Sequence, residues 1–211
     1  LELRGKRVLI RVDFNVPVDE KGAITDDTRI RASLPTIAEI VAKGGKPILL
    51  SHFGRPKGKV VDSMRLTRVG KRLAQLLLTP LQKLDESIGP RVADAIAKAD
   101  PKTTILLENV RFHPGEEKSD SALAAEFAKL GDVFVDDAFG SSHRDHASVC
   151  GIARLLPSAA GRLMEKEIAA FRRVLVDPAQ PFIAILGGAK VSDKLKVVEH
   201  LLEKVDAILV G

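Results

Sequence analysis

The sequence contains no Trp, no Tyr and a single Cys among its 211 residues. One Cys excludes a disulfide framework and a Cys-rich zinc site, and it fits a reducing compartment, so we expect a cytoplasmic location. The absence of Trp and Tyr argues against a nucleic-acid-binding protein that stacks bases on aromatic rings, although the net charge is +5. No apolar run approaches the roughly 20 residues that span a membrane, so no membrane partner is expected.

What is present is typical of a globular protein. Hydrophobic residues make up 45% of the chain and charged residues 29%, and the length suits one or two domains with a core. The charge is uneven, since residues 1–80 carry 16 Lys and Arg against 8 Asp and Glu. A basic first part indicates either an ordinary solvated surface or a site for a small, highly charged anion.

Short apolar runs alternate with segments of helical periodicity. We expect strands at 8–12, 47–50, 104–107 and 133–135, and helices at 28–43, 66–78, 92–97 and 121–130. Pro35 is expected to end a first short turn, with the helix restarting after it. The strands are apolar on both faces and are separated by helices, which predicts an α/β fold with a doubly wound parallel sheet.

The last third of the chain has its own pattern. A loop-rich stretch over 151–161 leads into a helix over 163–176, and a break follows. A strand over 182–186, a helix over 192–205 and a strand over 207–210 then form one βαβ unit. A lone βαβ unit cannot cover both faces of a parallel sheet, so we expect a second domain that is cut off at Gly211.

Polar and charged residues follow nearly every strand at once. The clusters are Asp13 and Asn15; Ser51, His52, Gly54 and Arg55; Glu108, Asn109, Arg111 and His113; Asp136, Asp137, Ser141, Ser142, His143, Arg144 and His146; and Gly187, Gly188, Lys190 and Lys194. The carboxyl ends of strands in an open α/β sheet form the rim at which ligands bind, so five clusters on one rim would converge on a cleft. Loops are polar in any protein, but that alone does not predict Arg or Lys in four of the five.

Arginine is the informative residue in these clusters. Its planar fork matches phosphate and carboxylate oxygens two bonds at a time. Arg29, near the start of a helix, and Arg55, Arg111 and Arg144, in rim loops, together indicate a ligand with phosphate and carboxylate groups. An arginine taken alone is more often part of a surface salt bridge worth at most about 1 kcal/mol, so the joint pattern carries the inference. His52 fits the same ligand as a hydrogen-bond donor.

Other motifs leave alternatives open. Asp136 and Asp137 fit a Mg²⁺ site or a catalytic acid about as well as a structural role at a strand end. Neither a Walker-type phosphate loop nor a G-x-G-x-x-G motif occurs. The segment 187–190, Gly-Gly-Ala-Lys, still follows a strand and precedes a helix, where glycines and the helix dipole favour phosphate.

Five segments resemble the motifs of phosphoglycerate kinases. They are RVDFNVP at 11–17, SHFGRP at 51–56, LENVRFH at 107–113, DAFGSSHR at 137–144 and LGGAKVSDK at 186–194. The resemblance runs in order from Leu1 to Gly211. Five motifs in order and at compatible spacings argue strongly against a chance resemblance.

The resemblance implies two Rossmann-like α/β domains around a hinged cleft. It makes residues 1–160 a domain that binds 3-phosphoglycerate, 161–177 a linker helix, and 178–211 the start of a domain that binds ADP or ATP. Mg²⁺ would arrive with the nucleotide, and the resemblance assigns no metal ligand in this chain. It also implies a monomer that contacts the nucleotide mainly through residues beyond 211.

The resemblance also implies roles for single residues. Asp13 and Asn15 would bind the glycerate hydroxyl and carboxylate, and Arg29 the carboxylate and the phosphoryl group in transfer. The remaining substrate-binding positions would be Phe14, Phe53, Gly54, His52, Arg55, Arg111 and Arg144, the last three forming a basic phosphate pocket. The nucleotide-binding positions would be Gly187, Gly188, Lys190 and Lys194, with Arg29 and Lys190 catalytic.

The implied reaction is reversible phosphoryl transfer between ATP and the carboxylate of 3-phosphoglycerate, giving 1,3-bisphosphoglycerate and ADP. The attacking carboxylate is already ionised, so positioning and charge neutralisation would carry catalysis without a general base. The alternative is a non-catalytic module that only binds a phosphorylated metabolite. We expect weak or no turnover from the 211 residues alone.

Overall fold

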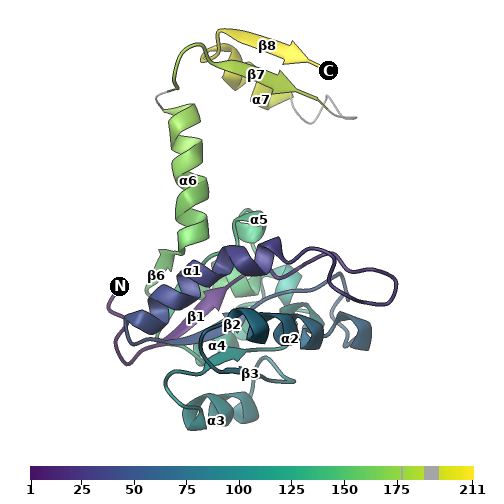
Figure 1. The fold of residues 1–211 in the computed structure, drawn as a ribbon, viewed down its shortest axis with the longest axis vertical. Helices are drawn as coiled ribbons and strands as arrows, with labels where there is room; N and C mark the ends of the chain where they lie inside the picture. The colour runs from purple at the N-terminus through teal and green to yellow at the C-terminus, as the bar shows by residue number, and fades with distance from the viewer. Residues whose placement is uncertain (177, 188–194) are drawn as a thin grey trace. The chain divides into compact units, whose positions relative to one another are not determined.

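The computed structural model describes residues 1–176, 178–187 and 195–211. The chain divides into two compact units, Leu1–Glu165 and Lys166–Gly211 (Figure 1). The three-part division at residues 160 and 177, expected from the sequence, stays a prediction.

A six-stranded parallel sheet forms the centre of the first unit, with the strand order β3-β4-β2-β1-β5-β6. The strands are β1 (Arg7–Arg11), β2 (Lys46–Leu50), β3 (Leu81–Lys83), β4 (Thr104–Leu106), β5 (Val133–Asp136) and β6 (Ser158–Ala160). At the end of β1, Arg11 lies opposite Leu50 on one side and Asp136 on the other. The strands therefore end almost level with one another.

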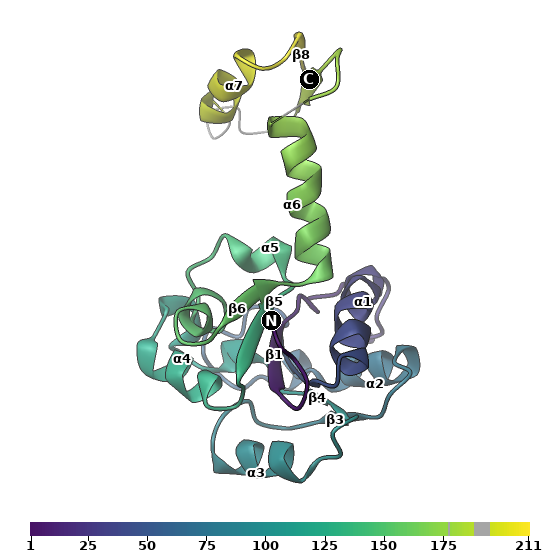
Figure 2. The same cartoon turned by 90° about the vertical axis from the view of Figure 1, so that its left-hand side faces the viewer.

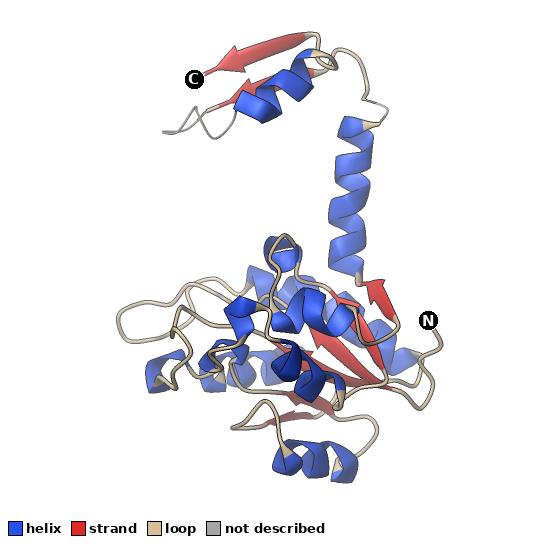
Figure 3. Cartoon of the chain, turned by 180° about the vertical axis from the view of Figure 1, so that it is seen from behind, coloured by secondary structure: helices blue, strands red, loops and turns tan. Residues whose placement is uncertain are grey.

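Helices cover both faces of this sheet (Figures 2 and 3). The helices are α1 (Thr28–Ala42), α2 (Thr67–Leu76), α3 (Pro90–Lys98), α4 (Ser121–Ala128), α5 (Phe139–Ser142) and α6 (Arg162–Leu175), with short 3₁₀ turns at 62–64, 110–112 and 116–118 and a π-helical turn at 147–151. One core cluster joins α1 and α2 to one face, for example through Ile37 and Leu73. A second joins α3 and α4 to the other through Ile96 and Phe127. The doubly wound α/β fold is thus confirmed.

Helix α1 departs from the expectation at Pro35. The helix is continuous across this residue, so the predicted restart after a short first turn is wrong. Pro35 is exposed, while Ile30, Ile37 and Ile40 on both sides of it are buried in the core. Packing of this apolar stripe outweighs the local cost of proline inside a helix.

Strands β3 and β6 were not predicted. β3 has the sequence Leu-Gln-Lys, and β6 has Ser-Ala-Ala with all three residues exposed. Both lie at the edges of the sheet, where one neighbour suffices and no continuous apolar run is required. The stretch at 151–161 therefore holds a strand as well as loops.

The second unit contains most of α6 and one parallel strand pair. β7 (Ile183–Leu186) pairs with β8 (Ala207–Val210), and α7 (Leu195–Leu202) lies between them in the chain. The predicted βαβ unit is present, although the first predicted helical residues, 192–194, lie outside the described residues.

Candidate functional site

Four polar clusters meet at one edge of the first unit's sheet. β4, β2, β1 and β5 are consecutive and parallel, so the loops after them leave the sheet at the same edge. These loops begin at residues 107, 51, 12 and 137. The structure thus brings together four of the five clusters that the sequence singled out.

The fifth cluster does not share this edge. Gly187 directly follows β7, whose partner among the described strands is β8, in a sheet separate from that of the first unit. The expectation that five clusters occupy one rim is therefore wrong. Gly188, Lys190 and Lys194 lie outside the described residues, and Gly187 itself is exposed.

The loop after β1 carries a carboxylate and an amide that tie three segments together. Asp13 Oδ2 accepts a hydrogen bond from Arg29 Nη1 at 2.7 Å, which joins the loop to the start of α1. Asp13 Oδ1 accepts one from the backbone N–H of Asn15 at 3.1 Å. Asn15 Oδ1 in turn accepts from the backbone N–H of Gly54 at 2.8 Å. Asp13, Asn15, Arg29 and Gly54 therefore lie together, as the sequence predicted.

Gly54 has a backbone reason to be glycine. Its φ is +65°, and a Cβ there would lie 2.9 Å from Met64 Sδ. Its carbonyl accepts a hydrogen bond from Arg111 Nη1 at 3.0 Å. The glycine therefore lets the loop turn sharply while both of its backbone polar groups bind neighbouring site residues.

The four predicted arginines differ in whether an acidic side chain pairs with them. Arg29 is half exposed and paired with Asp13. Arg111 is buried, and its Nε lies 3.3 Å from Glu117 Oε1. Burial lowers the pKa of Arg111, and the nearby charge of Arg144 adds to that lowering.

Arg55 and Arg144 are exposed, and neither guanidinium forms an ion pair with a described residue. Their forks are free to take an oxyanion without breaking an internal pair. Two unpaired cations beside the buried Arg111 make this edge electropositive, which favours a ligand with several negative charges.

His52 lies within the electrostatic reach of Arg111 and Arg144 and is almost completely buried. Its Nδ1 is 3.1 Å from Arg11 Nη2. Burial, together with the charges of Arg11, Arg111 and Arg144, lowers the pKa of His52 to about 2. The imidazole is therefore neutral at physiological pH and can donate a hydrogen bond without adding charge.

Phe14 and Phe53 belong to the core. Phe14 is fully buried and Phe53 nearly so, in the cluster that packs under α1 and α2. The backbone N–H of Phe14 is already bonded to Ser51 Oγ at 2.9 Å. The side chains of both residues therefore support the loops from below.

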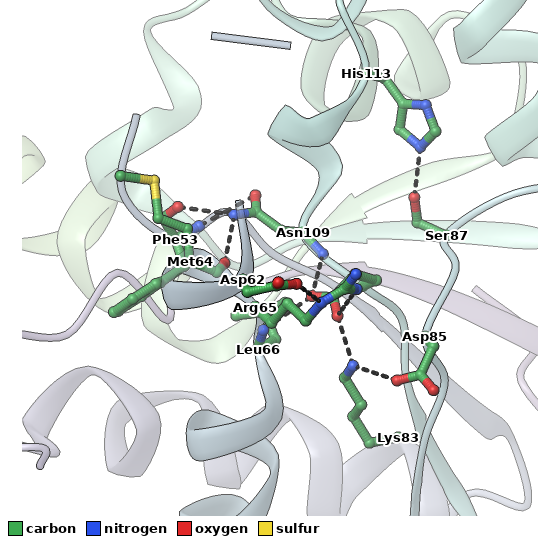
Figure 4. Close-up of polar contacts among 11 residues, drawn as sticks. Phe53, Asp62, Met64, Arg65, Leu66, Lys83, Asp85, Ser87, Asn109 and His113 are labelled. Atoms are coloured by element: carbon green, nitrogen blue, oxygen red, sulfur yellow. Dashed lines mark hydrogen bonds and ion pairs between the residues drawn. The ribbon is translucent and has the colours of Figure 1, made fainter. Parts of the chain in front are cut away.

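Glu108 is a buried carboxylate for which the sequence predicted no role. Its Oε1 accepts hydrogen bonds from the backbone N–H groups of Leu66 and Asn109, both at 2.8 Å. Its Oε2 lies 2.5 Å from Lys83 Nζ and 3.4 Å from Arg65 Nη1 (Figure 4). Glu108 therefore joins the start of α2 to β3 and β4.

Asn109 holds the loop between β2 and α2 at two points. Its Nδ2 donates to the carbonyls of Phe53 at 2.7 Å and Met64 at 2.9 Å (Figure 4). Its Oδ1 accepts from the backbone N–H groups of Phe53 and Arg111. The loop that carries Arg55 is thus clamped from β4. An acid–amide pair directly after an apolar strand was the only sequence signal for this clamp.

The contacts of Asp137 distinguish between the alternatives that the sequence left open for it, a Mg²⁺ site, a catalytic acid or a structural role. Its Oδ1 accepts hydrogen bonds from the backbone N–H groups of Leu163 at 2.9 Å and Met164 at 3.4 Å, at the start of α6. Gly161 packs so closely on the carboxylate that a Cβ would collide with it. Burial raises the pKa of Asp137. These contacts are those of a helix cap, so its role here is structural.

A sequence model of the phosphoglycerate kinase family matches residues 1–211. The chain belongs to the phosphoglycerate kinase family. It is similar to the phosphoglycerate kinase from Coxiella burnetii, with 40% identity, a TM-score of 0.86, and coverage of 100% of this chain and 52% of that one. It is also similar to the enzyme from Pyrococcus horikoshii OT3, with 34% identity, a TM-score of 0.86, and coverage of 100% and 54%. The chain spans about half the length of these phosphoglycerate kinases.

The described residues lack two features that concern metals and membranes. Within the described ranges, no group of three or more His, Cys, Asp or Glu is placed to hold a metal ion. No helix in the described part of the chain is both long enough and apolar enough to cross a bilayer.

Proposed function

We propose that this chain supplies the 3-phosphoglycerate side of a phosphoglycerate kinase. The reaction is reversible transfer of a phosphoryl group between ATP and the carboxylate of 3-phosphoglycerate, giving 1,3-bisphosphoglycerate and ADP. Family membership supports the reaction class. The observation that carries the proposal is the pair of exposed guanidinium groups, Arg55 and Arg144, at the carboxyl edge of the sheet. Neither forms an ion pair with an acidic side chain in the described part of the chain.

The substrate fits this edge by charge and by hydrogen bonding. Arg55, Arg111 and Arg144 would take the phosphate, because three guanidinium groups match its charge and its oxygens. Asp13 would accept a hydrogen bond from the glycerate hydroxyl, since the Asp13 carboxylate already lies at this edge. Asn15 would assist there, and Arg29 would reach the substrate carboxylate.

The nucleotide side of the proposal rests on the segment after β7. Gly187 and Gly188 would lie against the nucleotide, Lys190 would support the transferring phosphoryl group, and Lys194 would contact nucleotide phosphate. Mg²⁺ would neutralise the nucleotide phosphates and arrive bound to them. We assign no protein ligand to it in this chain.

Catalysis would come from positioning and charge neutralisation. A carboxylate nucleophile is ionised at neutral pH, and the neutral His52 is not needed as a base. Arg29 and Lys190 would offset charge on the transferring group. Closure that brings the two substrates together would exclude water, which otherwise competes for the phosphoryl group.

The remaining partner assignments stay predictions. We propose a cytoplasmic monomer that binds small phosphorylated ligands, with neither nucleic acid nor membrane as a partner. We also propose that residues 1–160 form the substrate domain, 161–177 the connecting helix and 178–211 the beginning of the nucleotide domain.

The test is a calorimetric titration of the chain with 3-phosphoglycerate, using inorganic phosphate as the control anion. We expect saturable binding that is tighter than binding of phosphate. Arg55→Ala and Arg144→Ala should each weaken it about tenfold or more, since a charge-assisted hydrogen bond contributes about 1.5–3 kcal/mol.

Arg91→Ala is the matched control, because Arg91 is highly exposed on α3 and belongs to none of the four clusters. It should leave the affinity unchanged. Unchanged affinity in both Arg55→Ala and Arg144→Ala, in folded protein, would show that the phosphate binds elsewhere.

A further inference from the structure

A chain of buried hydrogen bonds runs beneath the proposed substrate site. Arg11 Nη2 lies 3.1 Å from His52 Nδ1, and Arg11 Nε donates to Ser148 Oγ at 2.9 Å. Ser148 Oγ in turn lies 2.5 Å from Glu116 Oε1, and Glu116 Oε2 accepts from the backbone N–H of Ser148 at 3.0 Å. Arg11, Ser148 and Glu116 are completely buried.

Every bond in this chain has only one possible direction. A guanidinium group has donors and no acceptor, so Arg11 must donate to both Ser148 Oγ and His52 Nδ1. Ser148 has one hydroxyl proton and accepts from Arg11, so that proton goes to the carboxylate of Glu116. His52 Nδ1 must therefore be unprotonated, and in a neutral ring the single proton lies on Nε2.

We propose that Arg11, Ser148 and Glu116 form a buried relay that fixes His52 in the Nε2–H tautomer and so makes it an uncharged donor toward the bound anion. Arg11, Ser148 and Glu116 are positioning residues in this proposal, because they act through His52. The proposal rests on the proposed function for the identity of the anion. Its structural part, the tautomer, depends only on the contacts within the chain.

The other ring nitrogen of His52 is available to a ligand. His52 Nε2 has no hydrogen-bond partner among the described residues and is not one of the fully buried unpartnered atoms, so it keeps contact with solvent. An Nε2–H there attracts an oxyanion, whereas the Nδ1–H tautomer would turn a lone pair toward it. The relay therefore decides whether His52 attracts or repels the ligand.

The surroundings of His52 also keep it from becoming a cation. Four charged or titratable side chains act on His52. They are Arg11 on β1, Arg111 after β4, and Arg144 and His146 after β5. Together with burial they lower the pKa of His52 to about 2. A neutral ring needs its tautomer specified, which a doubly protonated ring does not.

The experiment is a nitrogen-15 NMR measurement of the histidine side chains of the whole chain near pH 7. The two ring nitrogens of each histidine report separately whether they carry a proton. We expect His52 to show protonated Nε2 and unprotonated Nδ1. A wild-type spectrum with protonated Nδ1 would overturn the proposal without any variant.

Ser148→Ala tests the relay itself. Without Oγ, Arg11 Nε loses its acceptor and Glu116 loses a donor. Arg11 Nη1 keeps its bond to the carbonyl of Val12, but the guanidinium loses the second anchor that directs Nη2 at His52 Nδ1. We expect both tautomers of His52 to become populated. Ser148→Thr, which keeps the hydroxyl, should restore the single tautomer.

Ser87→Ala is the matched control, because it removes another buried serine beside another histidine. Ser87 Oγ lies 2.7 Å from His113 Nε2. This variant should change the signals of His113 and leave those of His52 as in the wild type. A His52 tautomer that is unchanged in Ser148→Ala would refute the relay.

A binding measurement separates this proposal from the proposed function. If the tautomers become equally populated in Ser148→Ala, affinity for 3-phosphoglycerate should fall about twofold, since half of the molecules are competent to donate. A wild-type chain with the expected tautomer but no affinity for 3-phosphoglycerate would contradict the proposed function and leave the relay standing. A chain that binds 3-phosphoglycerate while His52 Nδ1 carries the ring proton would contradict the relay and leave the proposed function standing.

Discussion

Single charged residues link distant segments of the first unit, and Glu39 on α1 is one of them. Its carboxylate binds Arg162, at the start of α6, through two hydrogen bonds of 2.5 and 2.8 Å, and Lys43 at 2.7 Å. These partners lower the pKa of Glu39 to about 2. The interaction joins residues that are far apart in the sequence.

Glu39→Gln should lower the free energy of unfolding by at most about 1 kcal/mol near pH 7, as is typical of exposed ion pairs. The pKa of Glu39 is depressed in the folded state, so its contribution is present above the unfolded-state value of 4.5 and is lost as the pH falls toward about 2. Urea denaturation of both proteins across this range measures the difference. A difference that grows as the pH falls would contradict this assignment.

At the scale of secondary-structure elements, the ion pairs of Glu108 hold the start of α2 against β3 and β4. Glu108→Gln would place an amide N–H₂ group against Lys83 and Arg65 and remove the buried negative charge. We expect a loss of about 3 kcal/mol in unfolding free energy, because breaking a buried pair leaves an uncompensated charge. Denaturant unfolding is the measurement.

Glu126→Gln provides the control for that experiment. Glu126 is exposed on α4 and pairs with Lys129 three residues along the same surface. Its replacement should change stability by no more than about 0.5 kcal/mol. Equal effects of the two substitutions would mean that the Glu108 cluster contributes no more than a surface pair.

Replacement of Pro35 in helix α1 is expected to raise the free energy of unfolding, not to lower it. Pro35 lies inside the helix, is exposed and supplies no backbone N–H. Pro35→Ala would add one hydrogen bond and favour helical structure, so we expect a gain of roughly 1–3 kcal/mol. Thermal unfolding should show a higher midpoint. A lower midpoint would mean that the proline stabilises the start of the helix.

At the scale of the whole molecule, ligand binding and stability are coupled. A ligand that binds only the folded chain stabilises it by about 2.7 kcal/mol at a hundred times its dissociation constant. We expect 3-phosphoglycerate to raise the unfolding midpoint of the wild type and to have a much smaller effect on Arg144→Ala at the same concentration. An equal shift in both proteins would place the anion away from Arg144.

The positions of the central strands and of the four clusters could be predicted because they depend on local pattern. The centre of β1, residues 8–10, is buried on both faces and is apolar, and neighbouring parallel strands end at one edge. Edge strands such as β6 could not be predicted from an apolar run, because one face and one edge of such a strand can stay in contact with water. The continuation of α1 through Pro35 could not be predicted either, since it depends on how the helix packs against the sheet through Ile30, Ile37 and Ile40.

The fold class, the family and the residue types at the ligand edge follow from local sequence, because periodicity, strand ends and motifs are properties of neighbouring residues. Which charges are paired depends on the folded arrangement. Among the described residues it left Arg55 and Arg144 without acidic partners, set Asp137 at the start of α6, and joined Arg11 to Glu116 through Ser148. Hydrogen bonds and charge pairs act over a few ångströms in space, and the chain brings those partners together only by folding.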